Sequence, residues 1–225
     1  MKFIQGLQKL NFPQKEIDRL KPLMDSYINE LVLFNSAYNL VNTNDRDEII
    51  VRHILDSLSA ARHIKALAGE RAALSEEPVT VADIGSGGGL PGIPLAAALP
   101  QYNFVLVERM SKRCAFLENA AAILGLKNVA VKNLELEKTP AASFDIATFR
   151  AFRPLDNKML KSLLAVLKPG GVLAAYKARR EKILEEMGAL GYAEQDYKTI
   201  PLTVPFLTDT NSGDDRERNL VVISK

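Results

Sequence analysis

The sequence predicts an α/β fold, in which a mostly parallel, twisted sheet carries helices on both faces and a helical extension precedes it. Apolar runs rich in β-branched residues alternate with helical stretches from residue 79 onward, which predicts the sheet. A glycine-rich loop joins the first of these runs to a helix, as in nucleotide-binding α/β folds. Residues 1–70 instead show helical spacing alone. We therefore expect an extension over residues 1–70 and the α/β domain over residues 71–225.

The extension is expected to contain two main helices. Pro22 lies within the first apolar pattern and predicts a kink or a break there. Residues 42–45 form a loop with good capping residues, and the second helix is expected from about Arg46 to Ala66. The apolar positions that share one face of the first helix are Ile17, Leu20, Met24, Tyr27, Ile28, Leu31 and Phe34.

From residue 79 the elements follow one another with short connections. Helices are expected from Pro94, from Ser111 (which can cap its helix), over residues 154–167, and up to about Leu190. Residues 168–171 have the composition of a turn. The last two strands are expected to pair as a hairpin-like edge. The expected strands cover residues 79–84, 104–108, 128–131, 144–149, 172–176, 198–204 and 219–223.

Composition sets broad limits on function. The chain has 225 residues, 47% of them apolar, and a net charge of +2 that does not by itself indicate a nucleic-acid partner. A single cysteine excludes an internal disulfide and favours a cytoplasmic setting. We find no apolar run long enough for a membrane span and no metal-binding motif, and we expect a monomer.

The loop after the first strand has the pattern D-x-G-x-G-x-G, formed by Asp83, Gly85, Gly87 and Gly89. A dinucleotide fingerprint requires glycine where Leu90 stands, and the Asp83 carboxylate would repel a pyrophosphate. The same carboxylate suits the sulfonium and ammonium groups of S-adenosylmethionine. NAD is the alternative ligand, and a plain glycine turn is the structural alternative. The candidate cofactor-binding residues here are Asp83, Gly85, Ser86, Gly87, Gly89 and Leu90.

Further candidates follow the next two strands. Glu108 ends the second strand 23 positions after Gly85, where a carboxylate can accept the ribose hydroxyls of an adenosine. A surface acid at a strand end is the alternative. Leu136 and Glu137 follow the third strand and would lie beside the adenine, although ordinary alternation of apolar and charged residues explains them equally well.

Basic residues gather at the same sheet edge. Lys112 and Arg113 open a helix, where cations oppose the helix dipole, so a purely structural surface would avoid them. Arg150 and Arg153 follow the fourth strand, and Lys177, Arg179 and Arg180 follow the fifth. Clustered cations on a nearly neutral chain indicate an anionic partner such as RNA, with solvated helix starts as the alternative.

Several motifs together resemble the RsmG (GidB) family of bacterial ribosomal RNA methyltransferases. They are R-H-I-L-D-S over residues 52–57, D-I-G-S-G-G-G-L-P-G-I-P-L over residues 83–95, R-A-F over residues 150–152 and R-N-L-V-V-I over residues 218–223. The resemblance covers nearly the whole chain. It departs from the family pattern where Glu108 replaces a common aspartate, Glu135 a common arginine and Asn219 a common histidine.

The resemblance implies a class I, Rossmann-like methyltransferase that uses S-adenosylmethionine to form 7-methylguanosine in 16S (small-subunit) ribosomal RNA, free or in a ribosomal particle. Guanine N7 has a free lone pair and no proton to lose, so the reaction needs positioning and exclusion of water, not a general base. Gly85, Leu90, Leu136, Glu137 and Arg150 match family cofactor-binding positions.

Roles for the remaining candidates follow from this implied reaction. Arg150 is the catalytic candidate, at the junction of cofactor and base. Arg52 and His53 are expected to close the pocket from the extension, and the candidates for holding RNA phosphates are Lys112, Arg113, Arg153, Lys177 and Arg218. The alternatives are a methyltransferase for a small molecule or a protein, and a non-catalytic RNA-binding assembly factor.

Overall fold

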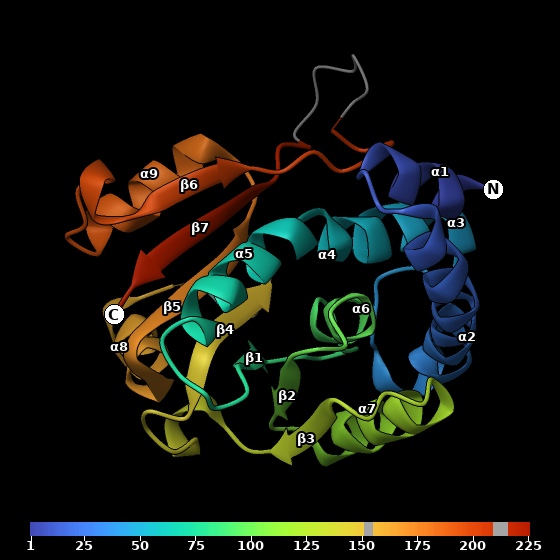
Figure 1. Ribbon diagram of the computed structural model, residues 1–225, viewed down its shortest axis with the longest axis horizontal. Coiled ribbons are helices and arrows are strands. Elements are labelled where there is room, and N and C mark those ends of the chain that lie inside the picture. The colour runs from blue at the N-terminus through green and yellow to red at the C-terminus, as the bar shows by residue number, and fades with distance from the viewer. Residues whose placement is uncertain (151–154, 209–215) are drawn as a thin grey trace.

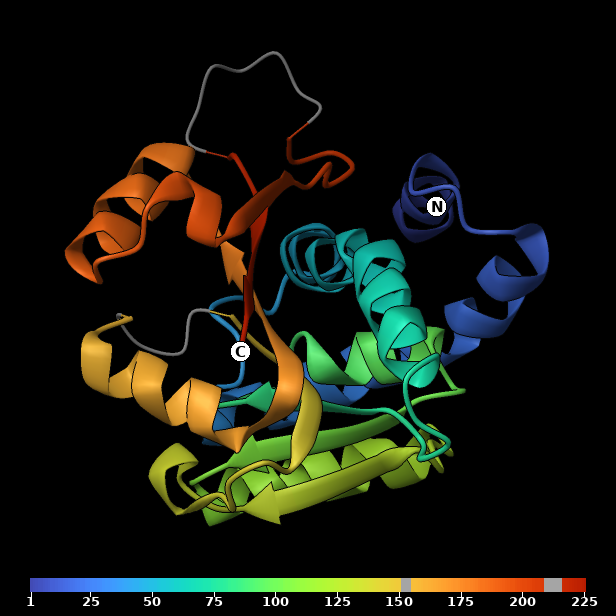
Figure 2. The same cartoon turned by 60° about the vertical axis from the view of Figure 1, so that its left-hand side comes forward.

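The computed structural model describes residues 1–150, 155–208 and 216–225. Its centre is a seven-stranded sheet in the order β3-β2-β1-β4-β5-β7-β6 (Figures 1 and 2). Strands β1 to β5 run parallel, and β7 and β6 are antiparallel additions at one edge, so the expected hairpin-like pairing of the last two strands is confirmed. The strands are β1 (Thr80–Ile84), β2 (Asn103–Glu108), β3 (Val129–Asn133), β4 (Phe144–Arg150), β5 (Leu167–Lys177), β6 (Lys198–Pro201) and β7 (Asn219–Ser224).

Helices cover both faces of the sheet, which confirms the predicted fold class. The extension, α6 (Gly92–Ala98) and α7 (Ser111–Ile123) share one apolar core with the sheet. A second core lies between the opposite face of the sheet and the helices α8 (Asn157–Val166) and α9 (Arg180–Ala189). The larger core contains residues from the extension and from the sheet, so the two parts are packed as one body.

The extension differs from its prediction in two respects. Helix α2 (Gln14–Tyr38) continues through Pro22 without a break, because its apolar face is buried along its length and packing outweighs the lost hydrogen bond. The second predicted helix is divided and contains a π-helical segment. The other elements of the extension are α1 (Lys2–Lys9), α3 (Arg46–Ile49), the π-helix η1 (Ile50–Leu55), α4 (Asp56–Ser59) and α5 (Ala61–Ala72). The division of the chain near residue 70 stays a prediction.

Smaller differences concern where elements begin. Ser111 does not cap α7; Met110 holds that position, and the Ser111 hydroxyl donates instead to Asn133 Oδ1 at 2.9 Å. Helix α8 begins later than predicted, behind Asp156, whose carboxylate accepts from the backbone N–H of Met159 at 2.7 Å. The predicted turn at residues 168–171 lies within β5. A helix of membrane-spanning length and hydrophobicity is absent from the described part of the chain.

The register brings several polar residues to one sheet edge. Glu108 and Arg150 end the parallel strands β2 and β4, so both lie at the carboxyl edge. Strand β7 runs the other way, and its first residue, Asn219, pairs with Lys177 at the end of β5. Arg218, which immediately precedes β7, therefore reaches the same edge, where ligands bind in open α/β sheets.

Candidate active site

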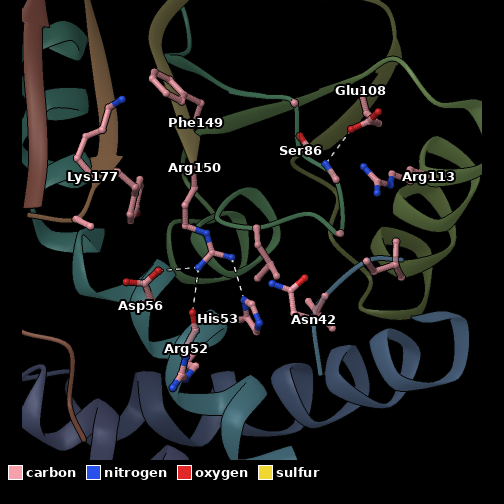
Figure 3. Close-up of a pocket in the computed structure, with 18 of the residues that line it drawn as sticks. Asn42, Arg52, His53, Asp56, Ser86, Glu108, Arg113, Phe149, Arg150 and Lys177 are labelled. Atoms are coloured by element: carbon pink, nitrogen blue, oxygen red, sulfur yellow. Dashed lines mark hydrogen bonds and ion pairs between the residues drawn. The ribbon is translucent and has the colours of Figure 1, made fainter. Parts of the chain in front are cut away.

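A cavity of about 950 Å³ opens at the carboxyl edge of the sheet, between the glycine loop, the ends of β2, β4 and β5, and the extension (Figure 3). It brings together residues predicted for cofactor binding and residues predicted for RNA binding. The predicted residues that line it are Gly85, Ser86, Gly87, Leu90, Glu108, Arg150, Arg52, His53, Arg113, Lys177 and Arg218.

The glycine loop turns tightly above the end of β1. The N–H groups of Gly85 and Ser86 both donate to the Val107 carbonyl, at 2.8 and 3.2 Å, which anchors the loop to β2. Gly87 has a φ of +56°, and a Cβ atom there would come no closer than 3.9 Å to the Gly85 carbonyl oxygen and 4.0 Å to Arg113 Nη1. The space beside Gly87 is therefore open, and the backbone of the loop is accessible to a ligand.

The other side of the loop packs against the extension. A Cβ atom on Gly88 would lie 3.0 Å from the Leu40 carbonyl oxygen, and the Tyr27 hydroxyl donates to the Gly88 carbonyl. Gly89, with a φ of +86°, is enclosed by Ile93, Leu117 and Tyr27. Gly88 and Gly89 thus allow close packing, whereas Gly87 faces open space.

Glu108 is a buried acid that supports the loop, not a surface acid. Its side chain accepts two backbone hydrogen bonds, one from Gly87 to Oε2 at 3.0 Å and one from Met110 to Oε1 at 2.9 Å. It also lines the cavity, so the carboxylate keeps lone pairs that a ligand hydroxyl can use (Figure 3).

Asp83 lies beneath the loop and is fully buried. Its Oδ2 accepts from the Gly92 N–H at 3.0 Å, and its Oδ1 is buried without a hydrogen-bond partner. Burial raises the pKa of this carboxyl to about 7, against the opposing effects of the Gly92 N–H, Ser86 and Arg150. Because Asp83 does not line the cavity, its influence on a ligand is exerted through the loop and through its charge.

Arg150 crosses from the end of β4 to the extension. Its Nη1 donates to Asp56 Oδ2 at 2.6 Å and to the Arg52 carbonyl at 3.2 Å, and its Nη2 donates to His53 Nδ1 at 3.3 Å. Three of these four residues belong to or directly follow the π-helix η1, a kind of segment that is frequent at functional sites. The predicted closure of the pocket by Arg52 and His53 thus involves direct contact with Arg150.

His53 is held neutral in this position. Desolvation lowers its pKa to about 4, and the charges of Arg150 and Arg52 add to the effect. A neutral imidazole can accept the hydrogen bond from Arg150 Nη2, so the low pKa and the geometry agree.

The predicted phosphate-binding residues divide into three groups. Lys177, Arg113 and Arg218 have polar partners, and Arg218 is ion-paired with Asp56 at 3.3 Å. Lys177 is ion-paired with Glu186 at 2.6 Å, and Arg113 donates to the Asn39 carbonyl at 2.9 Å, at the C-terminal end of α2. Lys112 is exposed and lies outside the cavity lining. Arg153 lies outside the described residues.

The residues predicted beside the adenine are separated from the cavity lining. Leu136 is buried in the second core, and Glu137 is exposed on a short 3-10 turn after β3. Asp56, Tyr176 and Asn42 also line the cavity, and no function was predicted for them. Asp56 lies within the motif R-H-I-L-D-S, but its partner Arg150 is 94 positions away, and the spacing of neighbouring residues gives no indication of that contact.

Comparison with known proteins identifies the family. A family model described as rRNA small subunit methyltransferase G matches residues 20–219. The chain belongs to this family. The resemblance seen in the sequence motifs is thereby confirmed, and the α/β fold with its loop-lined cavity is that of a methyltransferase.

Relatives named ribosomal RNA small subunit methyltransferase G align over most of the chain. The protein from Treponema denticola is 40% identical and covers 99% of this chain and 93% of its own length. The Treponema pallidum protein is 42% identical over 82% of this chain and 79% of its own length. The Borrelia turicatae protein is 31% identical over 96% of this chain and 94% of its own length.

Solved structures support the Rossmann-like methyltransferase fold of this rRNA small subunit methyltransferase G member. The tRNA (m1A58) methyltransferase TrmI from Aquifex aeolicus has a TM-score of 0.54 at 14% identity, over 76% of this chain and 68% of that chain. A SAM dependent methyltransferase from the same organism has a TM-score of 0.51 at 15% identity, over 80% and 93%. At these identities the likeness concerns the fold alone.

Proposed function

We propose that this enzyme transfers a methyl group from S-adenosylmethionine to N7 of a guanosine in 16S ribosomal RNA, in the cytoplasm. The observation that carries the proposal is one cavity shared by the carboxylate-supported glycine loop and an arginine network from the extension. Relatives over nearly the full chain are named ribosomal RNA small subunit methyltransferase G, which supports this RNA as the substrate.

The residues at the loop fit S-adenosylmethionine. The open space beside Gly87 suits a ligand that lies against the backbone, and Glu108 offers a buried carboxylate for ribose hydroxyls. Gly85, Ser86 and Leu90 would complete this side. Asp83 lies beneath the loop, and with a pKa of about 7 its carboxyl is partly charged at neutral pH. Leu136, Glu137 and Gly89 lie outside the cavity lining. We therefore propose an indirect role for them, in which Leu136 and Glu137 support the adenine side of the site and Gly89 supports the loop.

When bound, the cofactor supplies an electrophilic methyl group on a positively charged sulfur. Guanine N7 has no proton to remove, so the protein has to orient the base and keep water out. Arg150 faces the cavity from a fixed position and is our candidate for orienting the base or the cofactor. A neutral His53 fits a reaction without a general base, because it serves as a hydrogen-bond acceptor for Arg150.

The cationic residues around the cavity mouth would hold RNA phosphates. Lys177 and Arg218 line the cavity, and Lys112 extends the positive surface beyond it. Arg113 combines this role with its contact to the end of α2, and Arg153 is retained from the sequence alone. The enzyme is proposed to act as a monomer on the RNA or on a ribosomal particle.

The test is methyl transfer to defined substrates. Purified enzyme is incubated with labelled S-adenosylmethionine and either free 16S ribosomal RNA or small ribosomal subunits that lack the modification, and the RNA is digested to nucleosides. We expect label in 7-methylguanosine with at least one of the two substrates. Label in another nucleoside would refute the N7 assignment, and no transfer to either substrate would refute ribosomal RNA as the substrate.

A further inference from the structure

We propose that Asp56 is a positioning residue that holds Arg150 and Arg218 on one buried carboxylate and thereby sets the direction in which Arg150 meets its ligand. The inference rests on the proposed function, in which Arg150 contacts the cofactor or the base. It assigns a role to Asp56 that acts through Arg150, although Asp56 itself also lies in the cavity lining.

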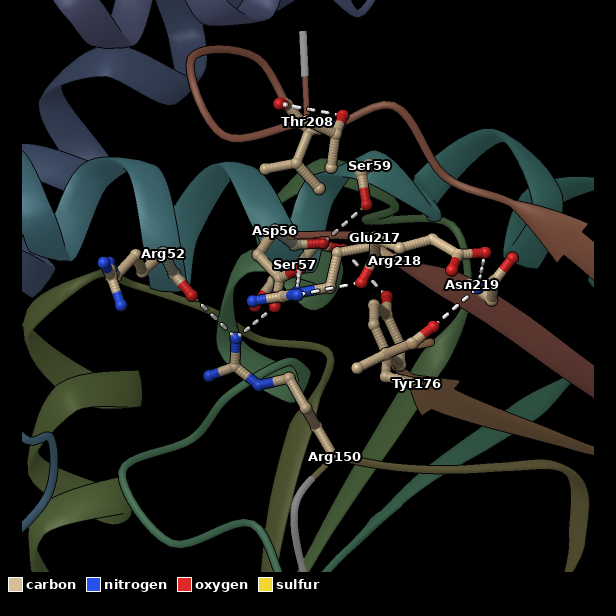
Figure 4. A network of polar contacts seen from close by, with 12 residues as sticks. Arg52, Asp56, Ser57, Ser59, Arg150, Tyr176, Thr208, Glu217, Arg218 and Asn219 are labelled. Atoms are coloured by element: carbon tan, nitrogen blue, oxygen red, sulfur yellow. Dashed lines mark hydrogen bonds and ion pairs between the residues drawn. The ribbon is translucent and has the colours of Figure 1, made fainter. Parts of the chain in front are cut away.

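The carboxylate of Asp56 is shared between two strand ends. Its Oδ2 lies 2.6 Å from Arg150 Nη1, and its Oδ1 lies 3.3 Å from Arg218 Nε (Figure 4). The Asp56 side chain is only 4% exposed, whereas Arg150 is 16% and Arg218 26% exposed. The acid is therefore the buried member of the group, and the two guanidinium groups extend from it toward the cavity.

The backbone that carries Asp56 is held by neighbouring contacts. The Ser57 carbonyl accepts from the Tyr176 hydroxyl at 2.8 Å, which joins α4 to β5. The Asp56 carbonyl accepts from the Ser59 hydroxyl at 2.7 Å. Figure 4 shows these residues between α4 and the strands that carry the arginines. A carboxylate on such a framework can impose an orientation on a flexible arginine.

Charge explains why this acid matters. Arg150 and Arg218 share Asp56, so without its charge two cations would be left close together at a partly buried site. The neighbouring His53 is neutral and cannot replace the lost negative charge. The repulsion would be relieved by turning one guanidinium away, and Arg150 would lose its fixed direction.

The chain offers a matched control at the opposite end of β4. Asp145 is 7% exposed and pairs with Arg71 at 3.5 Å and with Lys168 at 3.1 Å, and these two cations are 16% and 26% exposed. Like Asp56 it is a buried carboxylate between two partly buried cations, although Lys168 also pairs with Glu77 at 3.6 Å; it is the second residue of the strand and lies outside the cavity lining. Asp145→Asn should therefore lower stability without altering the site.

The experiment compares Asp56→Asn with Asp145→Asn in melting temperature, S-adenosylmethionine affinity by calorimetry, and steady-state methylation of ribosomal RNA. We expect both variants to melt earlier. Only Asp56→Asn should weaken cofactor affinity or lower kcat, by tenfold or more, and Asp56→Glu should recover part of the loss. Equal effects of the two variants on affinity and kcat, or an Asp56→Asn variant within twofold of wild type in both, would overturn the proposal.

A double variant tests the charge argument directly. Asp56→Asn combined with Arg218→Gln removes one of the two repelling cations, so cofactor affinity by calorimetry, or kcat at saturating RNA, should recover by at least threefold relative to Asp56→Asn alone; neither readout depends on the proposed contact of Arg218 with RNA phosphates. No recovery would overturn the shared-carboxylate mechanism. If wild-type enzyme bound the cofactor but did not methylate ribosomal RNA, the proposed function would fail, while the calorimetric comparison would still decide the role of Asp56.

Discussion

Replacing Glu108 with alanine should weaken the glycine loop and cofactor binding together. The carboxylate accepts from the Gly87 and Met110 N–H groups at 3.0 and 2.9 Å, and the residue is 5% exposed. Hydrogen bonds to a charged group contribute about 1.5–3 kcal/mol each. Water from the adjoining cavity can replace part of this, so we expect a loss of about 3 kcal/mol in the free energy of unfolding.

Urea denaturation measures this loss, with an unchanged m-value showing that the comparison is valid. Glu108→Gln keeps one carbonyl acceptor and should lose about half as much, because one of the two N–H groups then meets an amide NH₂. Glu70→Gln, an exposed acid on α5, is the control and should change stability by less than about 0.5 kcal/mol.

Calorimetry on the same variants separates the two roles of Glu108. If the carboxylate also accepts ribose hydroxyls, Glu108→Ala should weaken S-adenosylmethionine binding by roughly 1–3 kcal/mol. Lower stability with unchanged affinity would leave Glu108 as a support of the loop alone. If Glu108→Ala changed neither stability nor affinity, both proposed roles of the carboxylate would be refuted.

Further predictions concern charge and pH. Arg113→Ala should lower the melting temperature, because its hydrogen bond to the Asn39 carbonyl at the end of α2 is lost, whereas Lys112→Ala, at an exposed position, should not. Each variant should reduce the slope of log affinity for RNA against log salt concentration by about 0.7–0.9, and an unchanged slope would show that these residues do not contact RNA phosphates. The pKa of Asp83 is about 7 in the folded protein, against an ordinary value of 3.8. Between about pH 4 and pH 7 the folded state therefore holds a proton on Asp83 that the unfolded state has released, so the contribution of Asp83 to stability falls as the pH rises over this range. Urea denaturation across this range should show a flatter decline for Asp83→Asn, and an identical pH profile would contradict the shift. The pKa of His53 is lowered to about 4 from 6.5, so its contribution rises with pH over that interval, and His53→Gln should lose that rise in the same measurement; a rise that persists would show that His53 titrates normally.

Local patterns were sufficient to predict the sheet and the loop. The strand at β1 and the glycines after it are read from neighbouring residues, and so is the acid at the end of β2. The two backbone hydrogen bonds that Glu108 accepts were not predictable, since the bond from Gly87 joins residues 21 positions apart. The sequence thus shows which residue stands at the end of a strand, whereas the burial of that residue depends on the assembled fold.

Contacts between the extension and the sheet could not be predicted from the spacing of residues along the sequence. Arg113 was predicted to face RNA, yet its guanidinium donates to the Asn39 carbonyl, 74 positions earlier in the chain. Pro22 predicted a kink or a break, and the helix α2 is not broken there; the π-helical segment η1 interrupts a pattern that is typical of a regular helix. For Pro22 the packing of the apolar face of α2 outweighed the local preference. The contact of Arg113 with Asn39 adds a structural role to its predicted RNA contact, which stays a prediction.

Strand β4 carries a clamp at each end. Asp145 at its start holds Arg71 of α5, and Arg150 at its end holds Asp56 of α4. The two attachments are five residues apart, or about 17 Å along an extended strand. An outward movement of the extension as a single body would have to break both ion pairs, so each of them opposes that movement. Of the two, only the Asp56 attachment lies at the cavity, and it therefore holds the part of the extension that lines the site even when the distant attachment is lost.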